Sequence, residues 1–249
     1  MPRLRTGSNR VLQDSPTACL GDAVDYVWNG GRNENGFINN GSGPANNFDE
    51  GWMVTRSQAA NRGFFWNRQE SRFRDVLDGL SNTICAGEIV TSGAKREVKA
   101  DFVRRIAGAN ENPSLCKNGV HIDPSRPKFY TTTAQVNTAR GTRWSAGRPA
   151  DTSFQTILPP NSASCTFGGN FDNSESIFSA GSRHQGGAHL LMGDGAVIFM
   201  TDSVESGDLT AWPVERSTIS PPGIESPHGL WGALGTRSVC ETIEEQLNQ

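Results

Sequence analysis

Several signatures of catalysis are missing from this sequence. It contains no G-x-S-x-G nucleophile elbow, no G-x-x-x-x-G-K-S/T phosphate loop and no H-E-x-x-H zinc helix. None of its five cysteines forms a C-x-x-C pair, so the usual spacing of structural zinc ligands is absent. We therefore predict no catalytic residue, no metal ligand and no cofactor, and we expect that the protein is not an enzyme.

Long apolar runs and blocks of one charge are also missing. No segment approaches the roughly 18 apolar residues that a membrane helix needs, and the amino-terminal region holds no signal-peptide core. The net charge is −3, from 23 basic and 26 acidic residues without a long run of either sign. This balance does not suggest a nucleic-acid partner or binding to an anionic membrane surface.

Glycine is abundant, and its positions are the main basis for the fold prediction. The 28 glycines, together with Asn-Gly, Asp-Gly and Gly-Gly steps, favour short strands joined by tight turns. We predict an α+β fold of mostly antiparallel β structure. A chain of 249 residues can bury one sizeable core, so we expect a single domain with a loop-rich part at 1–70 and a core at 71–249.

Local patterns suggest only a few elements. A short helix is expected at 71–79 and a strand at 83–91, with a weaker strand at 102–106. Residues 1–20 are expected to be loosely ordered and 29–47 to form a surface loop. Residues 107–170 are expected to be mostly loop, and 241–247 to form a short helix.

The clearest local signal is HLLMGDGAVIFM at 189–200, where two apolar runs flank Asp194 and Gly195. Asp-Gly is a preferred pair for a two-residue type I′ turn, because both positions then need positive φ. That turn predicts strands at 189–193 and 196–200, with Leu190 opposite Phe199 and Leu191 opposite Ile198. Both faces of this hairpin are apolar, so both should be covered.

The same region resembles a known bacterial family. His184 is followed by nine residues and then Asp194-Gly195, which is similar to the signature of the prepilin-type, processing-associated H-x9-DG family. Three other stretches resemble that family in the right order, namely DGLSNTICAGE at 78–88, the segment 143–165 and LGTR at 234–237. The motif positions, for which we expect structural roles, are His184, Gly186, Gly187, Asp194, Gly195, Asp78, Gly79, Ser81, Asn82, Thr83 and Glu88.

The resemblance implies a pilin-like globular head, an extracytoplasmic location and a place in a pseudopilin-like or surface assembly. Family members usually begin with a prepilin leader and a long apolar helix, and this sequence has neither. Either the sequence is a shortened form, or its start lies downstream of the true one, or the protein has lost its anchor. We expect the segment to be missing from the sequence rather than from the protein. Contact with a membrane would then be made only through that amino-terminal helix.

A site built from His184, His189 and Asp194 is the sharpest chemical alternative. A strand rises about 3.3 Å per residue, so Asp194 at the hairpin tip should lie roughly 16 Å from His189. Metal ligands must converge within about 2 to 2.5 Å of one ion, which argues against this trio. Extending the predicted register instead places His184 opposite Glu205, as a structural pair at the base of the hairpin.

Two other functions stay open. The second choice is a module that binds carbohydrate or another extracellular ligand, because Trp28, Trp52, Trp66 and Trp144 lie near Gly/Asn-rich loops. A hydrolase is the third choice. Calcium is a minor possibility at 46–49 or 170–173, although neither stretch matches an EF-hand loop. The binding module predicts an aromatic-lined cleft, whereas assembly predicts an apolar groove where the missing helix would pack.

Two further expectations concern the assembly hypothesis. If the chain is exported, Cys116 and Cys165 are the first candidates for a disulfide, because both are expected in long loops. Without the helix, one face of the hairpin should be exposed. That strip would include either Leu190, Met192 and Phe199 or the set of Leu191, Ile198 and Met200.

Overall fold

The computed structural model describes residues 14–23, 38–39, 47–48, 62–65, 72–143, 145, 149–167, 176–214 and 223–241. Within these residues no helix is long and apolar enough to cross a membrane. The helical elements are short: α2 (Pro149–Thr152), α3 (Gly229–Ala233) and the 3-10 turns η1 (Phe73–Asp75), η2 (Leu80–Asn82) and η3 (Pro113–Lys117).

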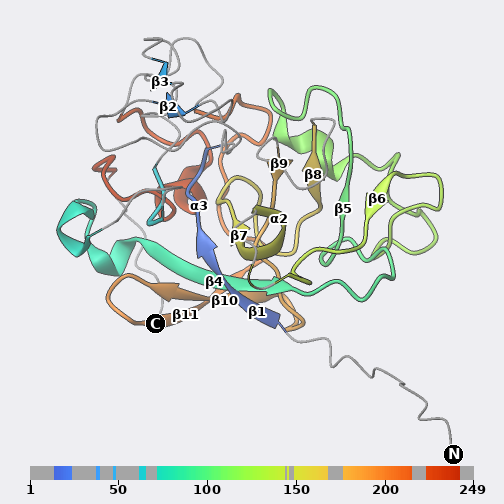
Figure 1. The fold of residues 1–249 in the computed structure, drawn as a ribbon, viewed down its shortest axis with the longest axis horizontal. Coiled ribbons are helices and arrows are strands. Elements are labelled where there is room, and N and C mark those ends of the chain that lie inside the picture. Colours follow the sequence, from blue (N-terminus) through green and yellow to red (C-terminus); the bar gives the residue numbers. More distant parts are fainter. Residues whose placement is uncertain are drawn as a thin grey trace, which may run out of the picture.

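The larger sheet has five strands in the order β11-β10-β4-β1-β7 (Figure 1). They are β1 (Asp14–Cys19), β4 (Ile84–Val90), β7 (Ser153–Phe154), β10 (Gly187–Met192) and β11 (Val197–Thr201). All neighbours are antiparallel except the pair of β1 and β7. The prediction of a mostly antiparallel, β-rich α+β fold is therefore confirmed.

A second sheet has the order β6-β5-β8-β9 and lies to the right of the first in Figure 1. Its strands are β5 (Phe102–Val103), β6 (Val136–Asn137), β8 (Ser164–Thr166) and β9 (Ser176–Ile177). A separate two-stranded ribbon joins β2 (Ile38–Asn39) to β3 (Asn47–Phe48). Such short strands agree with the high glycine content.

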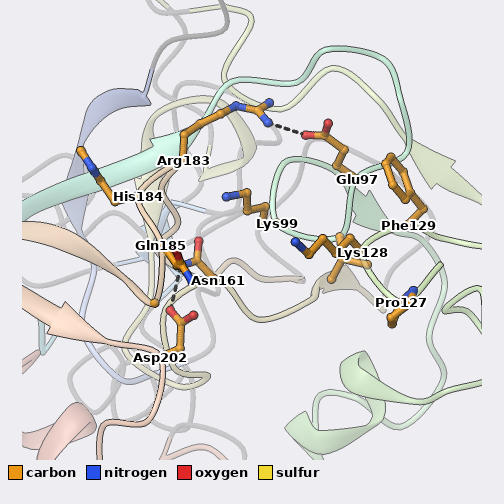
Figure 2. A pocket seen from close by; sticks show the side chains of 12 residues that line it. Glu97, Lys99, Pro127, Lys128, Phe129, Asn161, Arg183, His184, Gln185 and Asp202 are labelled. Atoms are coloured by element: carbon orange, nitrogen blue, oxygen red, sulfur yellow. Dashed lines mark hydrogen bonds and ion pairs between the residues drawn. The ribbon is translucent and has the colours of Figure 1, made fainter.

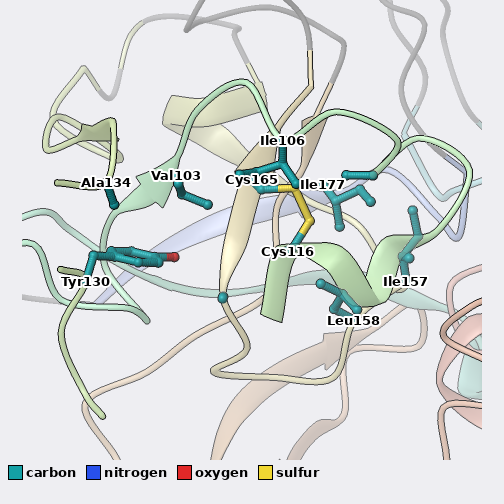
Figure 3. Packing of buried hydrophobic residues seen from close by; sticks show 11 residues of the cluster. Val103, Ile106, Cys116, Tyr130, Ala134, Ile157, Leu158, Cys165 and Ile177 are labelled. Atoms are coloured by element: carbon teal, nitrogen blue, oxygen red, sulfur yellow. A yellow bond between two sulfur atoms is a disulfide. The ribbon is translucent and has the colours of Figure 1, made fainter. Parts of the chain in front are cut away.

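Each of the two larger sheets has its own apolar cluster. The cluster on the larger sheet includes Ile84, Phe154, Leu190 and Trp231, all at most 1% exposed. The cluster on the second sheet surrounds a disulfide between Cys116 and Cys165 (Figure 3).

That disulfide confirms the predicted pairing, although one of the reasons for it was wrong. Cys165 lies in strand β8 and Cys116 in the 3-10 turn η3, rather than both in loops. Cys19, Cys85 and Cys240 are free thiols.

The predicted hairpin exists, but its register is wrong by one residue. Leu190 pairs with Ile198 and Leu191 with Val197. The Met192 carbonyl accepts the Gly195 N–H at 3.0 Å, and the Met192 N–H donates to Ala196 at 2.8 Å. Of the non-glycine residues with positive φ, none lies in this turn, whereas Gly195 has φ +93°. The connection is thus a three-residue loop with a glycine bulge, and the extra residue shifts every pair.

The observed register places the apolar side chains on two faces of the hairpin, one buried and one exposed. Leu190 and Met192 are 1% and 2% exposed and face the core. Leu191, Val197 and Phe199, which we call the apolar strip, are 38%, 65% and 44% exposed on the opposite face. An exposed strip on the hairpin was expected, but its members come from both of the predicted sets and include Val197.

Other local predictions had mixed outcomes. The strand expected at 83–91 is β4, and the one at 102–106 shortens to β5. The helix expected at 71–79 is only the single turn η1, because Val76 at its end is already extended. Residues 14–19 form β1 inside the larger sheet, so the expectation of loose order there was wrong; β4 supplies its antiparallel partner. The helix expected at 241–247 lies outside the described residues except for its first position.

Candidate functional site

The motif residues gather at the two ends of β4. At the end where β4 begins, the Asp78 carboxylate accepts the backbone N–H groups of Val239 and Cys240 at 3.0 and 2.6 Å. It also accepts the Thr236 hydroxyl at 3.1 Å. The motif at 78–88 therefore holds the segment around 234–240, although the two are far apart in the sequence.

Thr83 and the hairpin tip complete this contact. The buried Thr83 hydroxyl lies 3.1 Å from the Gly79 carbonyl and 3.2 Å from that of Thr236. At the tip, the N–H of Gly193 donates to the Thr83 carbonyl at 2.9 Å and that of Asp194 to Leu80 at 3.2 Å. The Thr83 hydroxyl and these backbone groups together join three motifs, which is a structural arrangement.

The remaining motif residues here serve local geometry. Gly79 has φ +94°, which a side chain would resist. Asn82 donates its side-chain amide to the Asp78 carbonyl at 3.2 Å, and Ser81 is exposed. The Asp194 carboxylate accepts the Ala196 N–H at 2.9 Å, so Asp194 acts in the turn as expected, but without positive φ.

Charge is also buried at this end of β4. Arg237, in the closing motif, is 5% exposed, and its guanidinium donates to the Gly63 carbonyl. Burial lowers the pKa of Arg237 to about 9, while the carboxylates of Asp75 and Asp78 act against that shift.

The other end of β4 brings three potential metal ligands together. Glu88 Oε1 lies 3.7 Å from His184 Nε2, and Glu88 Oε2 lies 3.4 Å from His189 Nδ1. One ligand atom from each residue lies within 4.8 Å of the other two. The His184 and His189 rings meet edge to face, with centroids 4.6 Å apart. We call these three residues the His–His–Glu cluster.

Two different structural features assemble this cluster. β10 pairs with β4 so that Leu190 lies beside Gly87, which places His189 beside Glu88. The backbone N–H of His189 donates to Glu88 Oε2 at 2.9 Å. His184 belongs to the preceding turn, where its own N–H donates to the Ser182 hydroxyl at 2.9 Å.

Gly186 and Gly187 make that turn possible. Gly186 has φ +83°, and its carbonyl accepts the Asp202 N–H at 2.9 Å. A Cβ on Gly187 would lie 2.1 Å from the Met200 carbonyl oxygen, so only glycine allows the hairpin to close at its base. The glycines between the two histidines thus fix where His184 meets β4.

A cavity of about 510 Å³ opens beside His184 (Figure 2). Its wall includes an ion pair between Arg183 and Glu97 at 2.9 Å and a hydrogen bond from Asn161 to Asp202 at 2.7 Å. Phe129 is the aromatic residue in its lining. In Figure 2, His184 lies at the margin of this cavity and points away from its centre.

The sequence reasoning found His184 but not its partner. The predicted partner, Glu205, instead accepts the N–H groups of Gly207 and Leu230, both at 2.6 Å. Asp194 lies at the opposite end of the hairpin and is not in the cluster, as expected, but His184 and His189 do come together. The missing signal was the pairing of β10 with β4, which links residues about a hundred positions apart.

The predictions on calcium and on tryptophan fall largely outside the described residues. The side chains at 46–49 and 170–173 are not described, nor are Trp28, Trp52, Trp66 and Trp144. Among the described tryptophans, Trp231 is buried and donates its indole N–H to Leu158 at 2.9 Å, whereas Trp212 is half exposed.

Comparison with known proteins places residues 21–207 within one family model, described as a protein of unknown function (DUF1559; SBP_bac_10). No curated protein and no solved structure matches the chain. The matched range includes both ends of β4 and the whole β10–β11 hairpin.

Proposed function

The chain belongs to the DUF1559 family, the H-x9-DG prepilin-like group, and on that premise we propose that it is a pseudopilin-like structural subunit of an extracytoplasmic assembly. In this proposal the subunit is not catalytic, and it acts in secretion or at the cell surface by contacting other pseudopilin-like subunits. Family membership alone supplies no reaction.

The observation that carries the proposal is the apolar strip. Leu191, Val197 and Phe199 project from one face of β10 and β11, and β11 is the last strand of its sheet. An edge strand with an apolar face is a surface that proteins normally cover. Because an edge strand can pair with the same strand of a second copy, a neighbouring subunit of the same kind is the occupant that we propose.

The disulfide supports the proposed location. Cys116 and Cys165 are both fully buried, in the apolar cluster of the second sheet. Disulfides of this kind persist in the periplasm and at the cell surface, whereas the cytoplasm keeps thiols reduced. A core built around such a bond suits a protein that is exported.

The cavity beside His184 favours a second candidate, an extracellular ligand-binding module. Its volume falls within the range of small-molecule sites. Several of its polar groups are already engaged, however: Arg183 pairs with Glu97, and Lys99 donates to the Ser182 carbonyl at 2.6 Å. The aromatic lining expected of a carbohydrate cleft is reduced to Phe129, so this candidate ranks second.

Sedimentation at increasing protein concentration tests the proposed contact. We expect the purified chain to self-associate and to bind a hydrophobic dye, because a second copy can cover the apolar strip. The double variant Val197→Ser/Phe199→Ser should reduce both signals. Val120→Ser is the matched control, since Val120 is 73% exposed but lies far from the hairpin in the sequence.

The proposal fails if the unaltered chain stays monomeric and binds no dye, or if Val120→Ser reduces association as much as the strip variant does. Thiol labelling in cells tests the location separately. After denaturation, which exposes these buried residues, an exported chain should resist labelling at Cys116 and Cys165 until it is reduced.

A further inference from the structure

We propose that Glu88, His184 and His189 bind one divalent transition-metal ion of the zinc class. The three side chains come from β4, from the turn before β10 and from β10 itself. No family description assigns this cluster a ligand, and the proposal does not depend on the assembly role.

The spacing of the three side chains is close to what a metal requires. Ligand atoms about 2.0 to 2.1 Å from a tetrahedral zinc ion lie about 3.3 Å from one another. The two histidine nitrogens lie 3.7 and 3.4 Å from the Glu88 oxygens. The widest separation in the set is at most 4.8 Å, so rotating an exposed imidazole can close it. His184, whose side chain is 53% exposed, is free to make that movement.

Two of the three ligands are held in place by the fold. Glu88 and His189 lie on paired strands, and the backbone N–H of His189 holds the Glu88 Oε2 atom at 2.9 Å. The His189 ring is enclosed further by Phe199, whose centroid is 5.1 Å away. A site with two fixed ligands loses little conformational entropy on binding, because only His184 has to be ordered.

The donor set also selects the class of ion. Two imidazoles and one carboxylate suit zinc, copper or nickel, whereas calcium and magnesium prefer a shell of oxygen atoms. The set carries one negative charge when both imidazoles are neutral, which favours a divalent cation. Three protein ligands leave a coordination position for water, as in open zinc sites.

Zinc binding to untagged, full-length protein is measured by competition with a chromophoric chelator. We expect one Zn²⁺ per chain. Replacing His184 or His189 with Ala, or Glu88 with Gln, should weaken the affinity at least 10-fold, because each change removes one of three ligands. Cobalt should give a visible absorption band that disappears in the same variants, which reports coordination directly.

The matched control is His121→Ala, which removes a partly exposed histidine from a different part of the molecule. Its affinity for zinc should equal that of the unaltered protein. Circular dichroism and thermal unfolding confirm that each variant is folded. The assignment is overturned if the folded protein binds none of Zn²⁺, Cu²⁺ and Ni²⁺. It is equally overturned if the double variant His184→Ala/His189→Ala binds zinc as tightly as the unaltered chain.

Discussion

Asp78 joins two segments of the chain through one carboxylate. Its oxygens accept hydrogen bonds from the N–H groups of Val239 and Cys240 and from the Thr236 hydroxyl. Hydrogen bonds to a charged group stabilise a fold more than neutral ones do. The aspartate of the DG-x-SNT motif is therefore explained by anchoring.

Replacing Asp78 with Ala should lower the free energy of unfolding by about 2 to 4 kcal/mol, because it leaves donors of three residues without their acceptor. Asp78→Asn keeps one acceptor oxygen and should cost less. Urea denaturation gives both values. Glu111→Gln is the control, since Glu111 is an exposed carboxylate outside the motifs, and a loss there equal to that of Asp78→Ala would contradict the anchoring role.

Long-range partners explain what the sequence could not predict at this scale. His184 was recognised from its spacing to Asp194, but its carboxylate partner lies on β4. No local pattern indicates that β10 pairs with β4 rather than standing only beside β11. Given the β4–β10 register, the proximity of Glu88 to His189 follows directly.

At the level of elements, the β10–β11 hairpin shows how one residue changes a surface. Asp-Gly between two apolar runs correctly predicted a hairpin here, but it predicted the wrong turn and therefore the wrong register. A two-residue turn would have placed Leu190 opposite Phe199, but the bulge at Gly195 places it opposite Ile198. Because side chains alternate along a strand, that single step moves Phe199 from the core face to the exposed face.

Gly195→Val should destabilise the protein by about 1 to 2 kcal/mol, because a β-branched residue resists positive φ. The effect should be purely conformational, since nothing lies within 4 Å of a Cβ built at this position. Gly119→Val is the matched control: it has the same open surroundings but no positive φ. Thermal unfolding of both variants makes the comparison. Equal losses would mean that the glycine bulge does not fix the turn.

At the scale of the whole molecule, the two larger sheets of the described residues have separate apolar clusters, and the disulfide stabilises only one of these sheets directly. Its two cysteines are 49 residues apart and bring η3 against β8 (Figure 3). The strands of the second sheet are only two or three residues long, so their hydrogen bonds alone hold it weakly. We infer that the covalent link compensates for this short sheet.

Breaking the bond tests that inference. Closing a loop of this length stabilises a protein by about 4 kcal/mol in the chain-entropy model, so Cys116→Ala/Cys165→Ala should lose a similar amount. Denaturant unfolding of the variant, and of the unaltered chain with and without a reductant, provides the measurement. Cys240→Ala removes an exposed free thiol and should not change the free energy of unfolding.

If the second sheet depends on the link, hydrogen exchange in the double variant should accelerate at Phe102 and Val103 more than at Leu190, because the larger sheet has its own core. Uniform acceleration would show instead that the two sheets unfold as one unit.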